Sequence, residues 1–361
     1  METMSPARFS EIGLFADMAA VTNDGIPFLL TLEHSPQRQP SGPSRPAAEA
    51  ATLRVWRAAS AGGLREVSRG ELTLPVATAV AMTMRSGHLV FLAQVTNPRP
   101  AYLLAAAWRL ADASPPVFSL AAMTPLALEA SLAGTVHIPP RDDWSTFGLR
   151  STEWLFHGSL TEGRGENEIA IAMNAADGRA VLWTSVVGSP PGPARPLAVV
   201  PAALNPVFLR AGGQNYLFYR KMPEGWSVFF HDLRHSTQFG PIALPLMMAR
   251  LDEGGGVARV VDLSTAMGIG PVFDFVVRVG EAGLALAVVS GSTTESRLRV
   301  FLSDPSSGDP VLSGPRERHA SVIPAVPYRL TMTVAGQTAL IGLAYKKPPV
   351  FELAALSLPL R

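Results

Sequence analysis

An aspartate interrupts an otherwise apolar stretch, GPVFDFVVRV, at residues 270–279. If this stretch is a β-strand, Asp274 shares one side with Arg278 and the phenylalanines occupy the other side, because side chains alternate along a strand. A carboxylate on a strand with both sides buried must find a hydrogen-bond donor or a cation, or lose its charge. Two hypotheses follow. Asp274 pairs inside the fold with an arginine or backbone amides, or it acts on a ligand as a catalytic acid, with Arg278 as a ligand-binding neighbour.

Histidine and aspartate cluster in FFHDLRH, residues 229–235. His231 and His235 would lie about 6 Å apart on a helix and could share a metal ion, but about 13 Å apart on a strand, where they could not. The preceding SVFF favours a strand that runs into a turn, so we predict no metal site here. His231 and Asp232 then either hold the strand end and the turn, or serve as catalytic acid and base.

The segment NYLFYRK, just upstream of these histidines, suits ligand binding. Tyr216, Tyr219 and Arg220 could stack on a sugar or an aromatic ligand and hydrogen-bond to it. Packing of the tyrosines in the core and a solvated arginine explain the same residues equally well. Both interpretations stay open.

Residues 139–159 are rich in aromatic and charged side chains and fit no repeat in the chain. Loops that interrupt a regular scaffold often carry function. We therefore predict a binding surface formed by Trp144, Arg150 and Trp154, with His157 as a catalytic candidate. Ordinary packing is the alternative.

Several kinds of chemistry are absent from the sequence. Cysteine does not occur, which excludes disulfides, thiolate nucleophiles and zinc–thiolate sites. We find no Gly-x-Ser-x-Gly elbow, Walker loop or HExxH motif, and we expect neither a metal nor a cofactor. The 30 basic and 29 acidic residues give a net charge of +1 without long runs of either sign, so we expect no nucleic acid or membrane partner. No apolar leader or membrane-spanning stretch is apparent, which predicts a cytoplasmic protein.

The elements that would position these residues are recurring hairpins. Each pairs two apolar segments around a short polar turn that contains a glycine, a residue that supplies the positive φ of tight turns. The hairpins span residues 78–95, 167–186, 205–219, 273–289 and 328–345, with Gly87, Gly178, Gly213, Gly283 and Gly336 in the turns. Helical periodicity is scarce. Phe9–Ala20 is the best helix candidate, although it could equally form an opening strand.

A third segment follows several of these hairpins and carries a large apolar residue such as Trp108, Phe230 or Phe301, and a further copy with Trp56 follows the early segment GIPFLLTLEHS. The segments LRVWRAASAGG and LRVFLSDPSSG resemble the outer strand and following turn of WD40-type and related propeller repeats, and the copies recur about every 50 residues. The resemblance implies an all-β fold, a β-propeller of seven blades with four antiparallel strands each. Six or eight blades, or two β-sandwich or barrel domains, are the alternatives.

This fold predicts a single domain over residues 24–361, with a mobile Pro/Ser-rich loop at residues 35–50 and an N-terminal segment, residues 1–23, that closes the ring. The leading functional hypothesis is a scaffold that binds a small molecule or a protein at its top face or in its axial channel. The alternative is a hydrolase or lyase whose axial site combines acids and histidines from different blades. Two carboxylates close together in a polar channel would favour the enzyme.

Overall fold

The computed structural model describes strands over much of the chain. The residues described are 2–3, 10–12, 14–23, 25–34, 48–59, 63–75, 77–85, 88–95, 102–111, 117–118, 124–126, 159–162, 168–174, 180–186, 195–200, 217–222, 225–231, 243–251, 257–280, 283–292, 294–303, 316–347 and 350–360. Apart from one short helix, the elements in this part of the chain are β-strands, which confirms the all-β prediction.

The described strands form six sheets, which we number in chain order. Sheet 1 consists of β3 (Leu14–Asn23), β4 (Ile26–His34), β5 (Ala48–Ala58) and β6 (Leu64–Pro75). Sheet 2 consists of β7 (Ala77–Arg85), β8 (His88–Val95), β9 (Tyr102–Ala111), β10 (Val117–Phe118) and β11 (Thr124–Leu126). Sheet 3 consists of β12 (Ser159–Glu162), β13 (Glu168–Asn174), β14 (Ala180–Val186) and β15 (Arg195–Val200).

The second half of the chain contributes the other three sheets. Sheet 4 consists of β16 (Leu217–Met222), β17 (Gly225–His231), β18 (Leu246–Leu251) and β19 (Val257–Asp262). Sheet 5 consists of β20 (Val272–Gly280), β21 (Gly283–Gly291), β22 (Ser296–Leu302) and β23 (Arg316–Ile323), with β1 (Glu2–Thr3) at its edge. Sheet 6 consists of β24 (Arg329–Ala335), β25 (Thr338–Lys347) and β26 (Val350–Pro359), with β2 (Ser10–Ile12) at its edge. The helix α2 (Leu263–Ala266) leads from sheet 4 to sheet 5.

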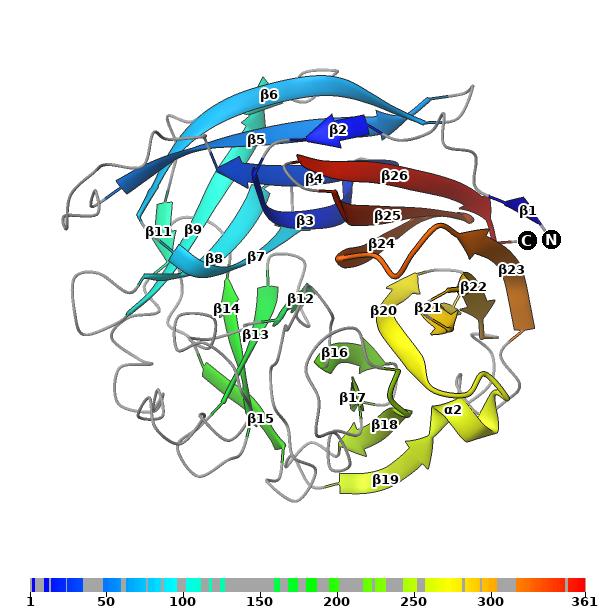
Figure 1. The fold of residues 1–361 in the computed structure, drawn as a ribbon. Coiled ribbons are helices and arrows are strands. Elements are labelled where there is room, and N and C mark those ends of the chain that lie inside the picture. Colours follow the sequence, from blue (N-terminus) through cyan, green and yellow to red (C-terminus); the bar gives the residue numbers. More distant parts are fainter. Residues whose placement is uncertain are drawn as a thin grey trace, which may run out of the picture.

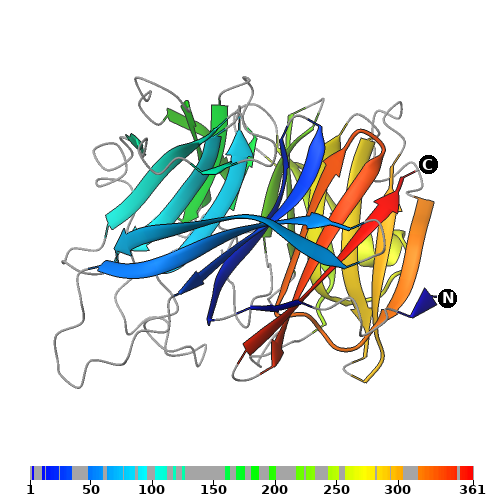
Figure 2. The same ribbon diagram turned by 90° about the horizontal axis from the view of Figure 1, so that it is seen from above.

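The first strands of the sheets lie next to one another around the centre of the molecule (Figure 1). In chain order β3, β7, β12, β16, β20 and β24 each contact the next, and β24 contacts β3. Seen from above in Figure 2, the strands run across the thickness of the molecule between two faces. The sequence predicted seven blades, whereas the described residues form six sheets. The number of blades therefore stays a prediction.

Four of the five predicted hairpins are present as antiparallel pairs, β7–β8, β13–β14, β20–β21 and β24–β25. The turn glycines Gly283 and Gly336 have φ values of 113° and 54°, as the prediction required. In the two-residue turn between β24 and β25, Ala335 pairs with Thr338 across Gly336 and Gln337, so a side chain at Gly336, where φ is positive, would strain the backbone. The other three predicted turn glycines lie outside the described residues.

The fifth predicted hairpin, at residues 205–219, stays a prediction because residues 205–216 lie outside the described part of the chain. In the described part β16 pairs antiparallel with β17. The segment GWSVFFH forms β17, the second of the four described strands of sheet 4, and Phe230 lies on it. Trp56, Trp108 and Phe301 do lie on third strands, as predicted.

The N-terminal residues run along three sheets. Glu2 and Thr3 pair in parallel with Ser321 and Val322 of β23, and β2 pairs antiparallel with β26. The chain then enters β3, so the strand interpretation of Phe9–Ala20 is correct and the helix interpretation is wrong. The proposed loop at residues 35–50 is shorter at one end, because Ala48 already begins β5, and residues 35–47 lie outside the described part.

Two apolar clusters join the sheets whose side chains are described. The larger one runs from sheet 4 through sheet 5 to sheet 6, for example from Phe229 through Phe275 to Met332. The smaller cluster joins sheet 6 to sheet 1 and contains Leu29 and Trp56. The first strands whose side chains are described, β3, β20 and β24, are therefore buried between neighbouring sheets, as the apolar runs in the sequence predicted.

Candidate functional site

Asp274 is the third residue of β20, the first strand of sheet 5, and is fully buried. The backbone N–H of Phe275 donates a hydrogen bond of 2.8 Å to Asp274 Oδ1. The register of β20 shifts between Val272 and Asp274, so the carboxylate lies directly after a β-bulge. Bulges disrupt the ladder locally, and one oxygen of Asp274 accepts from the strand's own backbone at this point.

Two more charged residues stand as far from the hairpin turn of their own strand as Asp274 does from its turn. Asp274 stands six residues before Gly280, the last paired residue of β20. Arg329 stands six residues before Ala335 on β24, and Asp17 six residues before Asn23 on β3. Three neighbouring first strands thus carry an acid, a base and an acid at one register position.

Asp17 and Arg329 were missed by the sequence analysis. Asp17 follows a register shift between Phe15 and Asp17, as Asp274 follows its own bulge. Arg329 is half-buried at the start of β24. The sequence holds a signal that could have found both, namely the constant distance to the hairpin turn, but its use requires knowing which strands are the first of their sheets.

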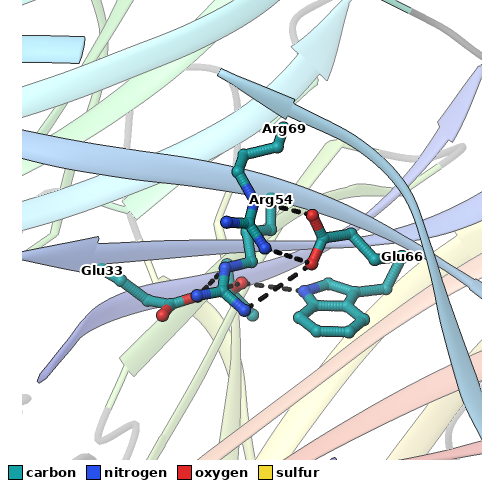
Figure 3. Close-up of polar contacts among 6 residues, drawn as sticks. Glu33, Arg54, Glu66 and Arg69 are labelled. Atoms are coloured by element: carbon teal, nitrogen blue, oxygen red, sulfur yellow. Dashed lines mark hydrogen bonds and ion pairs between the residues drawn. The ribbon is translucent and has the colours of Figure 1, made fainter. Parts of the chain in front are cut away.

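A second group of charged residues lies on sheet 1. We call Glu33, Arg54, Glu66 and Arg69 the sheet 1 ion cluster (Figure 3). The two oxygens of Glu66 accept from Arg69 Nε at 2.8 Å and Arg69 Nη2 at 3.0 Å, and Arg54 Nη1 lies 3.6 Å from Glu66 Oε2. Hydrogen bonds from Arg69 hold the pKa of Glu66 below its usual value, against the opposing effect of burial.

The buried end of the ion cluster is Glu33, whose side chain is only 4% exposed. Arg54 Nε lies 3.0 Å from Glu33 Oε1 as an ion pair, and the hydroxyl of Thr31 donates to the same oxygen at 3.3 Å. Thr31 in turn accepts from the indole N–H of Trp56 at 2.9 Å. Since Trp56 packs in the cluster between sheets 6 and 1, this network extends from the surface into that junction.

Sheet 5 repeats the outer part of this arrangement. Arg299 Nη2 lies 2.6 Å from Glu317 Oε2, and the guanidinium lies 5.0 Å from the ring centre of Phe301. On sheet 1 the corresponding guanidinium of Arg54 lies 5.8 Å from the ring centre of Trp56. Because the same contacts recur on a second sheet, we interpret them as structural. They hold the fourth strand against the third and are not a catalytic site.

Comparisons with known proteins bear on the fold. No family model matches the chain, and neither does any curated protein. A Trypanosoma rangeli sialidase, solved in complex with sialic acid, superposes with a TM-score of 0.50 at 10% identity, over 97% of this chain and 54% of the sialidase. The fold is a β-propeller. A propeller fold excludes the alternative of two sandwich or barrel domains. The chain spans about half the length of the sialidase.

Two other solved structures are similar at lower scores. A mutant of AofleA from Arthrobotrys oligospora has a TM-score of 0.48 at 10% identity, over 97% of this chain and 90% of that one. A GH43_1 enzyme from Xanthomonas citri has a TM-score of 0.39 at 11% identity, over 97% of this chain and 91% of that one. Similarity of fold does not transfer a function, so the site of this propeller must be argued from its own residues.

The propeller places the predicted site residues in different sheets or outside its described part. Asp274 and Arg278 share β20, where Arg278 Nη1 donates to the carbonyl of Val277 at 3.2 Å. His231 ends β17 of sheet 4, on a strand as predicted. Tyr219 and Arg220 lie on β16. Outside the described residues are Tyr216, Asp232, Trp144, Arg150, Trp154 and His157, so their roles stay predictions.

The described part of the propeller holds neither a metal-ligand cluster nor a membrane-spanning helix. No group of three or more histidine, cysteine or acidic residues there could hold a metal ion. No described helix has the length and apolar character needed to cross a membrane.

Proposed function

We propose that this propeller is a glycoside hydrolase with its active site at the axis, near the starts of the first strands. The observation that carries the proposal is the shared register position of Asp274 and Asp17 on β20 and β3, with Arg329 between them on β24. Most glycoside hydrolases use two carboxylates, one as acid and one as base or nucleophile. The sialidase whose fold this chain resembles belongs to a group that uses a tyrosine nucleophile instead of the second carboxylate, so we carry over only glycoside hydrolysis as part of the proposal and not the two-carboxylate mechanism.

The proposal needs a closed ring, because only then do the first strands converge on one axis. We propose six blades, one of the alternatives to the predicted seven. Contact between β24 and β3 supports this closure, and so does β2, which adds an N-terminal strand to the last sheet. The N-terminal segment would then close the ring, as predicted.

In this mechanism Asp274 and Asp17 supply the carboxylates, and Arg329, at the same register position of the intervening strand β24, supplies a positive charge. The Asp274 carboxylate is fully buried and accepts from the Phe275 N–H. Contact with a substrate therefore requires the buried carboxylate to become accessible. Removal of a general acid or base typically costs a factor of about 10² to 10⁴ in rate.

The test is hydrolysis of a panel of 4-nitrophenyl glycosides by the wild type and by Asp274→Asn and Asp17→Asn. Each variant should lower kcat/KM by about 10² to 10⁴-fold, whereas the control Glu66→Gln, in the sheet 1 ion cluster, should stay within about twofold. Hydrolysis that persists undiminished in both aspartate variants would refute the site.

A binding propeller without catalysis is the second candidate, and one observation favours it. The full burial of Asp274 and its bond to Phe275 N suit a residue that satisfies the backbone at a bulge. In that case Asp274→Asn lowers the free energy of unfolding, and the wild type binds glycans on an array without cleaving any of the glycosides.

A further inference from the structure

Side-chain hydroxyls join the first strands of the first and last sheets. Thr331 Oγ1 on β24 accepts from the backbone N–H of Ala20 on β3 at 2.9 Å. The hydroxyls of Thr333 and Thr22 lie 2.8 Å apart, and Thr22 Oγ1 also donates to the carbonyl of Val334 at 3.4 Å. We call these contacts the β3–β24 latch.

The latch supplies a hydrogen-bond acceptor at the unpaired edge of β3. Among the described strands β3 pairs with β4 along one edge, so the N–H groups on its other edge need acceptors from elsewhere. Ala20 is buried, which makes an unsatisfied N–H costly. Thr331, itself 4% exposed, supplies the acceptor from the neighbouring sheet.

This junction combines apolar packing with directional hydrogen bonds. An apolar cluster joins sheets 6 and 1, and apolar contacts by themselves have no preferred direction. Hydrogen bonds are directional, so the bonds of Thr331 and Thr333 specify one alignment of β24 against β3. Close packing adds to this, because a Cβ on Gly342 would stand 2.5 Å from Leu29 Cδ1 and 3.0 Å from Thr331 Cγ2.

The latched residues are close in sequence to the proposed axial site. Thr331 is two residues from Arg329, and Ala20 is three residues from Asp17. Along a strand, side chains two apart lie on the same side, so Arg329 shares a side of β24 with Thr331 and Thr333, the side that contacts β3. The alignment that the latch sets therefore also sets where Arg329 stands relative to Asp17.

We infer that Thr331 and Thr333 are positioning residues of the axial site, which they hold in register across the first and last sheets. The inference rests on the proposed function. The hydroxyl of Thr331 acts through the strands and does not touch the substrate. Misplacement of a catalytic group by about 1 Å can cost 10²-fold in rate, and a loosened latch permits shifts of that size.

The test compares Thr331→Val, which keeps the shape and removes the hydroxyl, with Thr331→Ser, which keeps the hydroxyl. Thr294→Val, on an exposed loop, is the control for loss of a hydroxyl elsewhere. For Thr331→Val we expect kcat of glycoside hydrolysis to fall about 10- to 100-fold with KM within about twofold, and the Ala20 amide to exchange with solvent faster. Thr331→Ser and Thr294→Val should match the wild type in both measurements.

Three outcomes would overturn the inference. One is a Thr331→Val variant with unchanged kcat and a lowered melting temperature only. Another is an equal loss in Thr331→Ser, which would assign the effect to the methyl group. The third is a crystal structure of Thr331→Val in which the Cα–Cα distance between Arg329 and Asp17 equals that of the wild type. The crystal and exchange measurements need no substrate, so an inactive wild type would refute the proposed function and leave the latch to be decided by them.

Discussion

Arg54 and Arg299 occupy the same place in two different sheets. Each lies on a third strand two residues before an aromatic ring, and each forms an ion pair with a glutamate on the fourth strand. In both sheets the register shifts just before the aromatic residue, which pairs with that glutamate. The two arginines differ in one respect, because only Arg54 also pairs with a buried acid, Glu33.

Because of this difference, we expect replacement of the two arginines to lower the free energy of unfolding by unequal amounts. Arg54→Met leaves the buried Glu33 without its ion pair and should lower the free energy of unfolding by about 2–3 kcal/mol. Arg299→Met removes only a half-exposed ion pair and a ring contact, so it should cost about 0.5–1 kcal/mol. Urea unfolding of both variants measures the difference. Equal costs would show that Glu33 does not depend on Arg54, and Arg54→Met with Glu33→Leu should recover part of the loss.

The lowered pKa of Glu66 predicts that the folded protein loses stability in acid. Its pKa is lowered in the folded protein, so its contribution is present above the unfolded pKa near 4.5 and is lost as the pH falls through the lower, folded pKa. The difference in unfolding free energy between the wild type and Glu66→Gln should therefore shrink as the pH falls below about 4.5. Urea titrations between pH 7 and pH 3 test this, with Arg69→Met as the variant that should reduce the same pH dependence.

Tyr345 predicts a loss of stability at the alkaline end. Burial raises the pKa of its phenol above the ordinary value of 10.0, and the residue is 6% exposed. Its contribution is fully present below the unfolded pKa and declines once the pH exceeds about 10, because the unfolded chain then ionises more readily. Denaturant titrations at pH 9 to 11 should show a steeper decline for the wild type than for Tyr345→Phe. Parallel curves would contradict the assignment.

The junction of sheets 6 and 1 has no room for a side chain larger than hydrogen at Gly342. Gly342→Ala places a methyl group 2.5 Å from Leu29 Cδ1, and Leu29 is fully buried. We expect a loss of about 1–3 kcal/mol in unfolding free energy from overpacking. Leu29→Val removes the opposing carbon, so the double variant should lose less than the sum of the single variants. Simple additivity in this double-mutant cycle would mean that the two side chains do not meet.

Removal of residues 1–12 tests the proposed ring closure. The deletion uncovers the edges of β23 and β26 that β1 and β2 now pair with. Uncovered strand edges pair with other chains, so the shortened protein should associate, which light scattering would detect, and should melt at a lower temperature. Removal of residues 1–6 alone, which keeps β2, should have the smaller effect. A monomeric, fully stable deletion variant would count against closure by β2.

Local patterns in the sequence predicted the strands, most hairpins and the buried state of Asp274, because alternation and glycine turns depend on residues a few positions apart. The same patterns also predicted a hairpin at residues 205–219, most of which lies outside the described part of the chain. They also missed Asp17 and Arg329. These residues are separated from Asp274 by long stretches of chain, and only the packing of β24 against β20 and β3 brings their strands together. That placement follows from burying the apolar faces of whole sheets against each other, an energy that no short segment of sequence displays.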